Sequence, residues 1–136
     1  MRPILLDTCA VLWSVSEGGL SDEARAAIES TDDGGPGILV SPISAWEIGM
    51  LVARGRIALP VSPDEWFATF LAQGVELAAM TPKILVDSSF LPGSQLRDPA
   101  DRIIAATARS QGYRLMTRDG PLLAYGAAGH MQVIPC

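Results

Sequence analysis

The sequence predicts an α/β fold in which a central parallel sheet of four to five strands is flanked by helices. Short apolar runs with the length of buried strands alternate with longer segments of helical patterning. Several of the longer segments begin with Ser, Thr or Asp followed directly by Pro, a pair that is typical of helix starts. Such alternation is typical of a parallel sheet covered on both faces, and 136 residues fit a single domain over residues 1–136.

Each element has a local signal. Four apolar runs are expected to form buried strands: Ile4–Leu6, Ile38–Val40, Arg114–Thr117 and Gln132–Ile134. Four helices are expected to begin at a proline that follows an N-cap residue, over about 42–54, 63–72, 82–89 and 99–111. Two further helices are expected over about 8–16 and about 22–30, the second with Ser21 as its N-cap.

Composition excludes several classes of protein. Hydrophobic residues make up 49% and charged residues 18%, so the chain is neither disordered nor fibrous. No apolar run is long enough for a transmembrane helix, and Asp7 interrupts the first one too early for a secretory signal. Two cysteines are too few for a disulfide scaffold, so a reducing cytoplasm is the expected location.

The same counts restrict the chemistry. One histidine excludes a two-histidine zinc site, and two cysteines exclude a four-cysteine site. The sequence contains neither a Walker phosphate loop nor a Gly-x-Ser-x-Gly elbow. A nucleophile pair of Cys9 and His130 is an alternative, although no further motif supports it.

Acidic residues follow two of the expected strands. Asp7 ends the first strand, and Asp119 follows the strand that ends at Thr117. Ligands of doubly wound sheets bind outside the carboxyl ends of the strands, so both acids are candidate site residues. Each also has a structural interpretation, Asp7 as a helix N-cap and Asp119 as a turn residue before Gly120-Pro121.

Glu47 is placed on an apolar stripe of an expected helix. At about 100° per residue, it lies within the stripe formed by Ile43, Trp46, Met50 and Leu51. A carboxylate on a core-facing stripe is costly unless it is paired or binds a metal ion. The alternative is a charge at the edge of the stripe that reaches water.

Asp101 repeats this pattern on a later helix. The same angular count places it among Ile104, Ala105 and Ala108. A capping-box variant with Asp98 is the alternative interpretation. Asp98 itself is interpreted as the N-cap, with at most a supporting role at the site.

Four acids are therefore expected to converge at one edge of the sheet: Asp7, Glu47, Asp101 and Asp119. Close carboxylates with no basic partner repel one another, and a hard divalent cation would relieve that repulsion. Carboxylates with open water positions suit Mg²⁺ or Mn²⁺, which can activate water and hold a phosphodiester. The pattern predicts metal-assisted hydrolysis.

The net charge of −5 does not exclude a nucleic-acid substrate. Without the four clustered acids, the 15 acidic residues fall to 11 against 10 basic ones, so the remainder is nearly neutral. Nine of the ten basic residues are Arg, which suits bidentate phosphate contacts. An ordinary solvated surface also explains most of them, and no basic patch argues for nucleic acid.

Nearly the whole chain resembles PIN-domain ribonucleases of the VapC type, which are toxins of bacterial toxin–antitoxin pairs. The order and spacing of five blocks carry the resemblance: Leu5–Trp13, Ser41–Met50, Leu91–Gly93, Asp98–Ala108 and Leu115–Asp119. At Gln95 the sequence departs from similar members, which often have a more polar or His-bearing stretch there. The segment Ser94–Arg97 is therefore a candidate for tuning substrate choice.

The resemblance implies a PIN-like fold and Mg²⁺- or Mn²⁺-dependent cleavage of RNA. It assigns the four acids of the family to Asp7, Glu47, Asp101 and Asp119, and two small hydroxyl residues to Thr8 and Thr117. It also implies a homodimer and a small VapB-like antitoxin that covers the active-site groove.

Two other functions are alternatives. One is a non-catalytic PIN-like module that binds RNA or a partner, against which the presence of all four acids argues. The other is a phosphotransfer enzyme or receiver domain that uses Asp7, but Leu6–Cys9 contains no second acid and Lys83 does not follow a strand.

Large apolar side chains also predict a protein partner. The early helices and the segment after Pro63 carry more of them than a small sheet needs, so some are expected at a dimer or antitoxin contact. These residues are Leu12, Trp13, Val15, Ile28, Trp66, Phe67 and Phe70.

Overall fold

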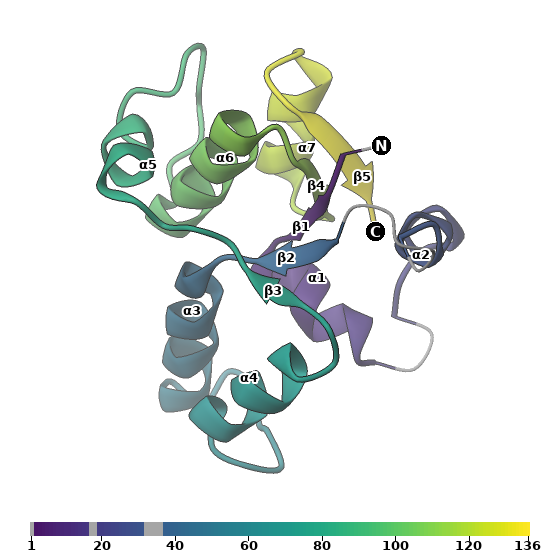
Figure 1. The fold of residues 1–136 in the computed structure, drawn as a ribbon. Helices are drawn as coiled ribbons and strands as arrows, with labels where there is room; N and C mark the ends of the chain where they lie inside the picture. The colour runs from purple at the N-terminus through teal and green to yellow at the C-terminus, as the bar shows by residue number, and fades with distance from the viewer. Residues whose placement is uncertain (1, 17–18, 32–36) are drawn as a thin grey trace.

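A computed structural model of the protein describes residues 2–16, 19–31 and 37–136 and contains the predicted parallel sheet (Figure 1). Within these residues the strands are β1 (Ile4–Leu6), β2 (Ile38–Val40), β3 (Glu76–Leu77), β4 (Arg114–Thr117) and β5 (Gln132–Pro135). They lie in the order β3-β2-β1-β4-β5, and every neighbouring pair is parallel. The α/β class and the sheet of four to five strands are confirmed.

Helices connect the strands throughout the described ranges. They are α1 (Thr8–Ser14), α2 (Asp22–Glu29), α3 (Pro42–Ala53), α4 (Pro63–Leu71), α5 (Pro82–Asp87), α6 (Pro99–Gln111) and α7 (Gly120–Ala127). Each begins after an N-cap residue whose side-chain oxygen accepts a backbone N–H of the first turn. None of them is both long enough and apolar enough to cross a membrane.

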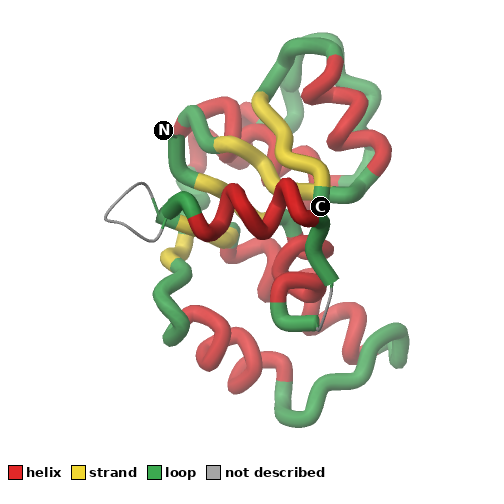
Figure 2. The backbone as a smooth tube through the Cα atoms, turned by 90° about the vertical axis from the view of Figure 1, so that its right-hand side faces the viewer, coloured by secondary structure: helices red, strands yellow, loops and turns green. Residues whose placement is uncertain are grey.

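Side chains of the strands alternate between two apolar cores, so helices lie on both sides of the sheet (Figure 2). Leu5 packs with Ile104 and with other buried residues of α5, α6 and α7. Leu6 packs on the opposite side with Ile48 and with buried residues of α1, α2 and α4. The chain is thus a three-layer α/β/α structure.

The strand order places a topological switch point between β1 and β4. Helices α1 to α4 follow β1 and β2 and cover one face, whereas α5, α6 and α7 lie between β3 and β5 in sequence and cover the other. The chain therefore leaves the ends of β1 and β4 in opposite directions. In open α/β sheets this crevice is where ligands bind.

Two elements were missing from the sequence-based prediction. Helix α7 begins where a turn was expected, because Asp119 caps a helix whose second position is Pro121. Strand β3 is two residues long and both are exposed, so no apolar run marks it. It pairs only with β2 and forms one edge of the sheet.

The large apolar side chains expected at a partner contact divide into two groups. Phe67 and Phe70 of α4 are buried in the core, and Leu12, Ile28 and Trp66 are half-buried against the same core. Trp13 is 42% exposed and Val15 is 50% exposed, both at the end of α1. Trp13 and Val15 therefore offer the most exposed apolar surface of the set to a partner, in line with the expectation that some of these side chains serve a contact.

Candidate active site

Asp7 is buried at the start of α1, directly after β1, with only 3% of its surface exposed. Its Oδ1 accepts the backbone N–H of Ala10 at 2.7 Å, which confirms its interpretation as an N-cap. Its Oδ2 accepts a hydrogen bond from the hydroxyl of Thr117 at the end of β4. The cap and the second hydrogen bond together fix this carboxylate at the switch point.

Thr117 also brings Asp119 to this edge. Its Oγ1 accepts the backbone N–H of Asp119 at 3.0 Å while it donates to Asp7. Asp119 is the N-cap of α7 rather than a turn residue, because its Oδ2 accepts the backbone N–H of Leu122 at 3.1 Å. One buried threonine therefore links the acids that follow the two adjacent strands.

Glu47 reaches the same edge from α3. Its Oε1 accepts a hydrogen bond from Thr8, whose Oγ1 lies 2.9 Å from the hydroxyl oxygen of buried Ser44. The predicted core-facing stripe was wrong, because Trp46 is 56% exposed and the buried residues of α3 are Ser44 and Ile48. Residues three apart share a helix face, so Glu47 lies beside Ser44 and faces α1.

The first turn of α6 contributes Asp98 and Asp101. The Oδ1 of Asp98 accepts the backbone N–H groups of Ala100 at 2.8 Å and Asp101 at 3.2 Å, so its interpretation as the N-cap is confirmed. Asp101 is half-buried, and its carboxylate makes no hydrogen bond or ion pair with the described residues. Without a bond back to Asp98, it is not part of a capping box.

The electrostatics show that these carboxylates act on one another. Burial, followed by the charge of Asp119 and those of three other acids, raises the pKa of Asp101 to about 7. Burial also raises the pKa of Glu47, against the hydrogen bond from Thr8 and together with neighbouring acidic charges. The pKa of Asp7 is raised by burial too, although its hydrogen bonds oppose the shift. We call Asp7, Glu47, Asp101 and Asp119 the acid cluster.

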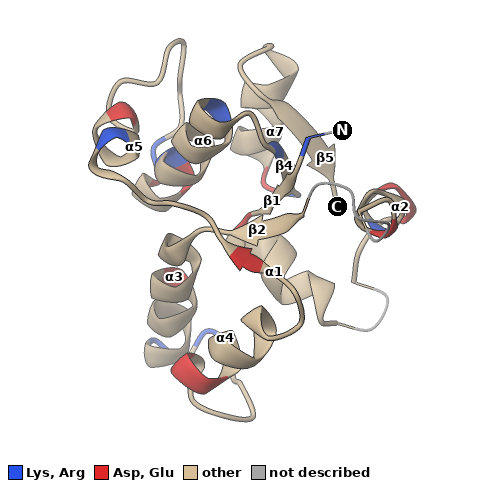
Figure 3. Ribbon diagram, viewed as in Figure 1, with Lys and Arg blue, Asp and Glu red and all other residues tan. Residues whose placement is uncertain are grey.

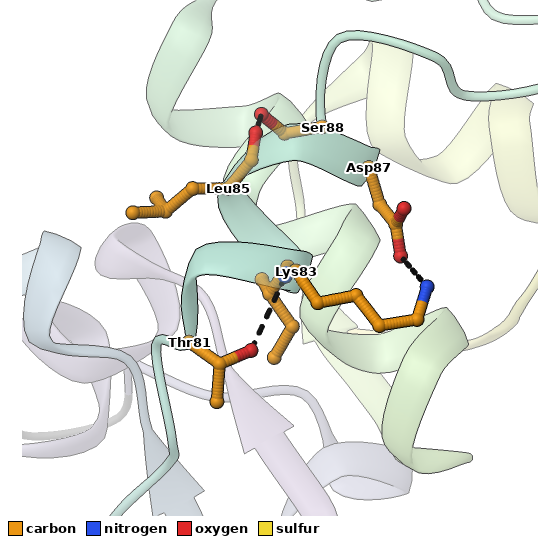
Figure 4. A network of polar contacts seen from close by, with 6 residues as sticks. Thr81, Lys83, Leu85, Asp87 and Ser88 are labelled. Atoms are coloured by element: carbon orange, nitrogen blue, oxygen red, sulfur yellow. Dashed lines mark hydrogen bonds and ion pairs between the residues drawn. The ribbon is translucent and has the colours of Figure 1, made fainter.

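No salt bridge neutralises the acid cluster within the described residues. Their one salt bridge joins Lys83 and Asp87 at 2.7 Å on α5, where Thr81 caps the helix and Ser88 donates to the carbonyl oxygen of Leu85 (Figure 4). That pair is exposed and spans one turn of its own helix. The carboxylates of the acid cluster therefore have no ion-pair partner among the described residues.

Arg118 is a component of the site that the sequence analysis did not identify. Its guanidinium lies 4.2 Å from the ring centroid of Trp13, donates to the carbonyl oxygen of Gly19 and contacts the Cys136 thiol. Its charge lowers the pKa of Asp7, so the expectation that no basic side chain lies near the acids was wrong. Only the position of Arg118 between Thr117 and Asp119 could have indicated this role.

The donor set fits a hard divalent cation in type and charge. Asp101 has both oxygens free, and Asp119 uses one oxygen for its cap, so oxygen ligands remain. Among the described residues, no three His, Cys, Asp or Glu side chains are gathered closely enough to hold an ion as they lie. Binding would therefore require the carboxylates to move closer together.

The alternative pair of Cys9 and His130 is not supported. Burial and the charges of the acid cluster raise the pKa of Cys9 to about 11, which keeps its sulfur protonated. His130 instead stacks on Tyr125, with ring centroids 4.5 Å apart. Neither residue has the environment of a cysteine nucleophile and its base.

Basic residues are dispersed over the described chain. Lys and Arg occur on several helices and near the N-terminus rather than along one element (Figure 3). Any contact to a polyanion would therefore come from separate elements, as the absence of a basic run in the sequence had indicated.

Comparison with known proteins agrees with this geometry. The model of the PIN domain family matches residues 4–126. Ribonuclease VapC22 of Mycobacterium tuberculosis is 36% identical over 126 residues, which cover 92% of this chain and 93% of the relative.

Solved structures show the same fold at low sequence identity. VapBC2 from Rickettsia felis, bound to a DNA fragment from its promoter, has a TM-score of 0.68 at 14% identity and covers 98% of both chains. Mycobacterium tuberculosis VapC20, described as a sarcin–ricin loop cleaving toxin, has a TM-score of 0.64 at 19% identity, over 97% of this chain and 99% of that one.

Proposed function

The chain belongs to the PIN-domain family and is a relative of the VapC ribonucleases, and from this premise we propose that it is a toxin endoribonuclease that cleaves RNA phosphodiesters with Mg²⁺ or Mn²⁺. The observation that carries the proposal is the acid cluster at the switch point. Burial and the neighbouring acidic charges raise the pKa values of Asp7, Glu47 and Asp101, and the acid cluster has no salt-bridge partner in the described chain. A divalent cation would balance that negative charge and could hold the anionic phosphodiester beside it.

The roles follow from the contacts of each residue. Asp7, Asp101 and Asp119 would hold the cation directly or through water, and Glu47 would orient a water molecule or complete the site. When bound, the cation supplies an activated water and balances the charge of the phosphodiester. Thr117 fixes the carboxylate of Asp7, and Thr8 fixes that of Glu47. These threonines limit the orientations of two acids before substrate arrives.

A small VapB-like antitoxin and a second copy of the chain are the proposed protein partners. The complex from Rickettsia felis is described as a VapBC pair, which supports an antitoxin for this relative. Trp13 and Val15 offer apolar surface at the C-terminal end of α1. The guanidinium of Arg118 lies against the Trp13 ring and its charge acts on Asp7, so this surface is connected with the acid cluster through Arg118. With RNA as the proposed substrate, we propose that the protein acts in the cytoplasm.

The proposal is tested with RNA and purified protein. The wild-type chain should cut RNA with Mg²⁺ or Mn²⁺ and lose this activity in EDTA, and Asp7→Asn should not cut while it keeps its circular dichroism spectrum. Asp64→Asn, which changes an exposed acid of α4, is the matched control and should cut normally. RNA binding without cleavage by the wild type would instead favour the non-catalytic alternative.

A further inference from the structure

A pocket lies between α7 and the loop that precedes α6, and it has no role in the chemistry described above. It has a volume of about 410 Å³, within the range of small-ligand pockets. One wall is a single face of α7, because Pro121, Ala124, Tyr125 and Ala128 follow the helical spacing of three and four residues. The side chains of Ala124 and Ala128 are short, so they leave the space beside this face of α7 unfilled.

The opposite wall is the loop between α5 and α6, which the structure holds firmly. Tyr125 donates from its hydroxyl to the carbonyl oxygen of Pro92 at 2.8 Å. Gly93 lies against His130, where an added Cβ would be 2.8 Å from Nε2, and its φ of +62° also favours glycine. Arg102 donates to the carbonyl oxygen of Leu96 at 2.6 Å. The loop is therefore pre-organised rather than free to fill the pocket.

Gln95 is the polar side chain that this loop presents to the pocket. Leu96 beside it is buried, whereas Gln95 is exposed and its amide makes no hydrogen bond with the described residues. An amide carries both donors and an acceptor, the combination that matches the edge of a nucleobase. Apolar walls with one free amide are typical of a pocket that selects a flat, partly polar group.

The pocket also has a defined position relative to the acids. Pro121 follows Asp119 by two residues, and Leu96 precedes Asp98, the N-cap of α6, by two residues. An RNA whose phosphate lies at the acid cluster would therefore carry a neighbouring base past this opening.

We propose that this pocket binds an unstacked nucleobase next to the cleaved phosphate and that Gln95 determines which base is preferred. The inference rests on the proposed ribonuclease function and extends it to substrate choice. Single-stranded RNA is recognised mainly through splayed-out bases read along their edges, which is the mode that this pocket offers.

Cleavage of a randomised RNA pool, followed by sequencing of the ends, tests the inference. The wild type should prefer one base at a single position near the cut by about tenfold, the scale of one two-point amide contact. Gln95→Leu should reduce this preference to about twofold, and Gln95→Glu should change the preferred base because a carboxylate only accepts. Ala124→Leu should lower cleavage by filling the pocket.

Two controls separate the pocket from general effects. Gln111→Leu changes an exposed glutamine at the far end of α6, and Ala127→Leu changes an exposed alanine of α7 that does not line the pocket. Both should keep the wild-type preference. An unchanged base preference in Gln95→Leu and Gln95→Glu would overturn the inference, as would undiminished cleavage by Ala124→Leu or an effect of these variants confined to antitoxin binding.

A binding experiment without cleavage distinguishes failure of the pocket inference from failure of the proposed function. The randomised pool is incubated in EDTA with wild type and Gln95→Leu, and the bound RNA is sequenced. If the wild type cuts no RNA, the proposed function fails, and the pocket inference stands only if wild-type binding shows a base preference that Gln95→Leu lacks. No RNA binding in this assay, or binding without preference, would overturn the inference too.

Discussion

The hydroxyl of Thr117 at the end of β4 donates to the carboxylate of Asp7 at the end of β1. The same oxygen accepts the backbone N–H of Asp119, and Thr117 is fully buried. A single side chain thus joins the two strands that flank the switch point and orients the acid between them.

Thr117→Val should destabilise the fold and weaken cleavage. Valine has nearly the same shape but leaves Oδ2 of Asp7 and the N–H of Asp119 without their partner, at a cost of about 1–3 kcal/mol in the free energy of unfolding. Loss of such an orienting bond typically lowers metal affinity or activity about 10- to 100-fold. Urea unfolding and RNA cleavage measure the two effects. Thr117→Ser keeps the hydroxyl and should lie near wild type, and equal losses in Ser and Val variants would contradict this role.

Substitutions of Asp98 and of Asp101 should have different effects on cleavage, although the two residues are only three positions apart. Asp98→Asn keeps an N-cap oxygen and should retain most activity, whereas Asp98→Ala should lower the free energy of unfolding by about 1 kcal/mol. Asp101→Asn should lose activity, because the variant lacks a carboxylate that is proposed to hold the cation. It should keep its fold, because that carboxylate makes no hydrogen bond or ion pair with the described residues. If Asp98→Asn were as inactive as Asp101→Asn, the choice of Asp101 as the site residue would be wrong.

Local signals made most of the fold predictable. The four predicted strands and six predicted helices are all present, with ends that differ by at most two residues, because caps, prolines and apolar runs act within a few residues. Helix α7 was missed because Gly120 separates its N-cap, Asp119, from Pro121, and a sequence of Asp, Gly and Pro is also typical of a turn. Strand β3 carries no such signal, since its pairing with β2 depends on the tertiary structure.

Of the candidate site, the sequence indicated the acids but not the contacts around them. Asp7 and Asp119 were indicated by their positions after strands, and Glu47 and Asp101 by apolar neighbours on their helices. The buried face of α3 depends on which layer covers it, so Trp46 was wrongly placed toward the core. Arg118 could not be identified because its contacts come from Trp13 and Gly19, about 100 residues away in sequence. Long-range contacts of this kind leave no local pattern.

The thiol of Cys9 should react slowly although it is exposed. Its pKa is raised to about 11 from an ordinary 9.0, so at pH 8 its thiolate fraction is about a hundredfold below that of an ordinary thiol. Iodoacetamide labelling in a Cys136→Ser background, followed by mass spectrometry, measures this rate. Mg²⁺ should accelerate labelling by balancing the acid cluster. A rate equal to that of a free thiol would show that the acids do not act on Cys9.

Neutralising one acid of the cluster should stabilise the metal-free protein. The pKa of Asp101 is about 7 in the folded chain, against an ordinary 3.8 that the unfolded chain keeps. Between about pH 4 and pH 7 the folded state therefore binds the additional proton, and its stability falls as pH rises through this range. Below pH 4 the residue is protonated in both states and contributes nothing.

Asp101→Asn should remove this loss of stability, so in EDTA at pH 7.5 the variant should be more stable than wild type by about 1 kcal/mol and melt at a higher temperature. Near pH 4 the two melting temperatures should converge. Mg²⁺ should raise the melting temperature of wild type with the logarithm of its concentration, because it binds the folded state, and should raise that of the variant less. Asp64→Asn, an exposed acid outside the cluster, should show neither effect. Equal melting curves for wild type and Asp101→Asn in EDTA, with no response to Mg²⁺, would mean that the four carboxylates do not form one charged site.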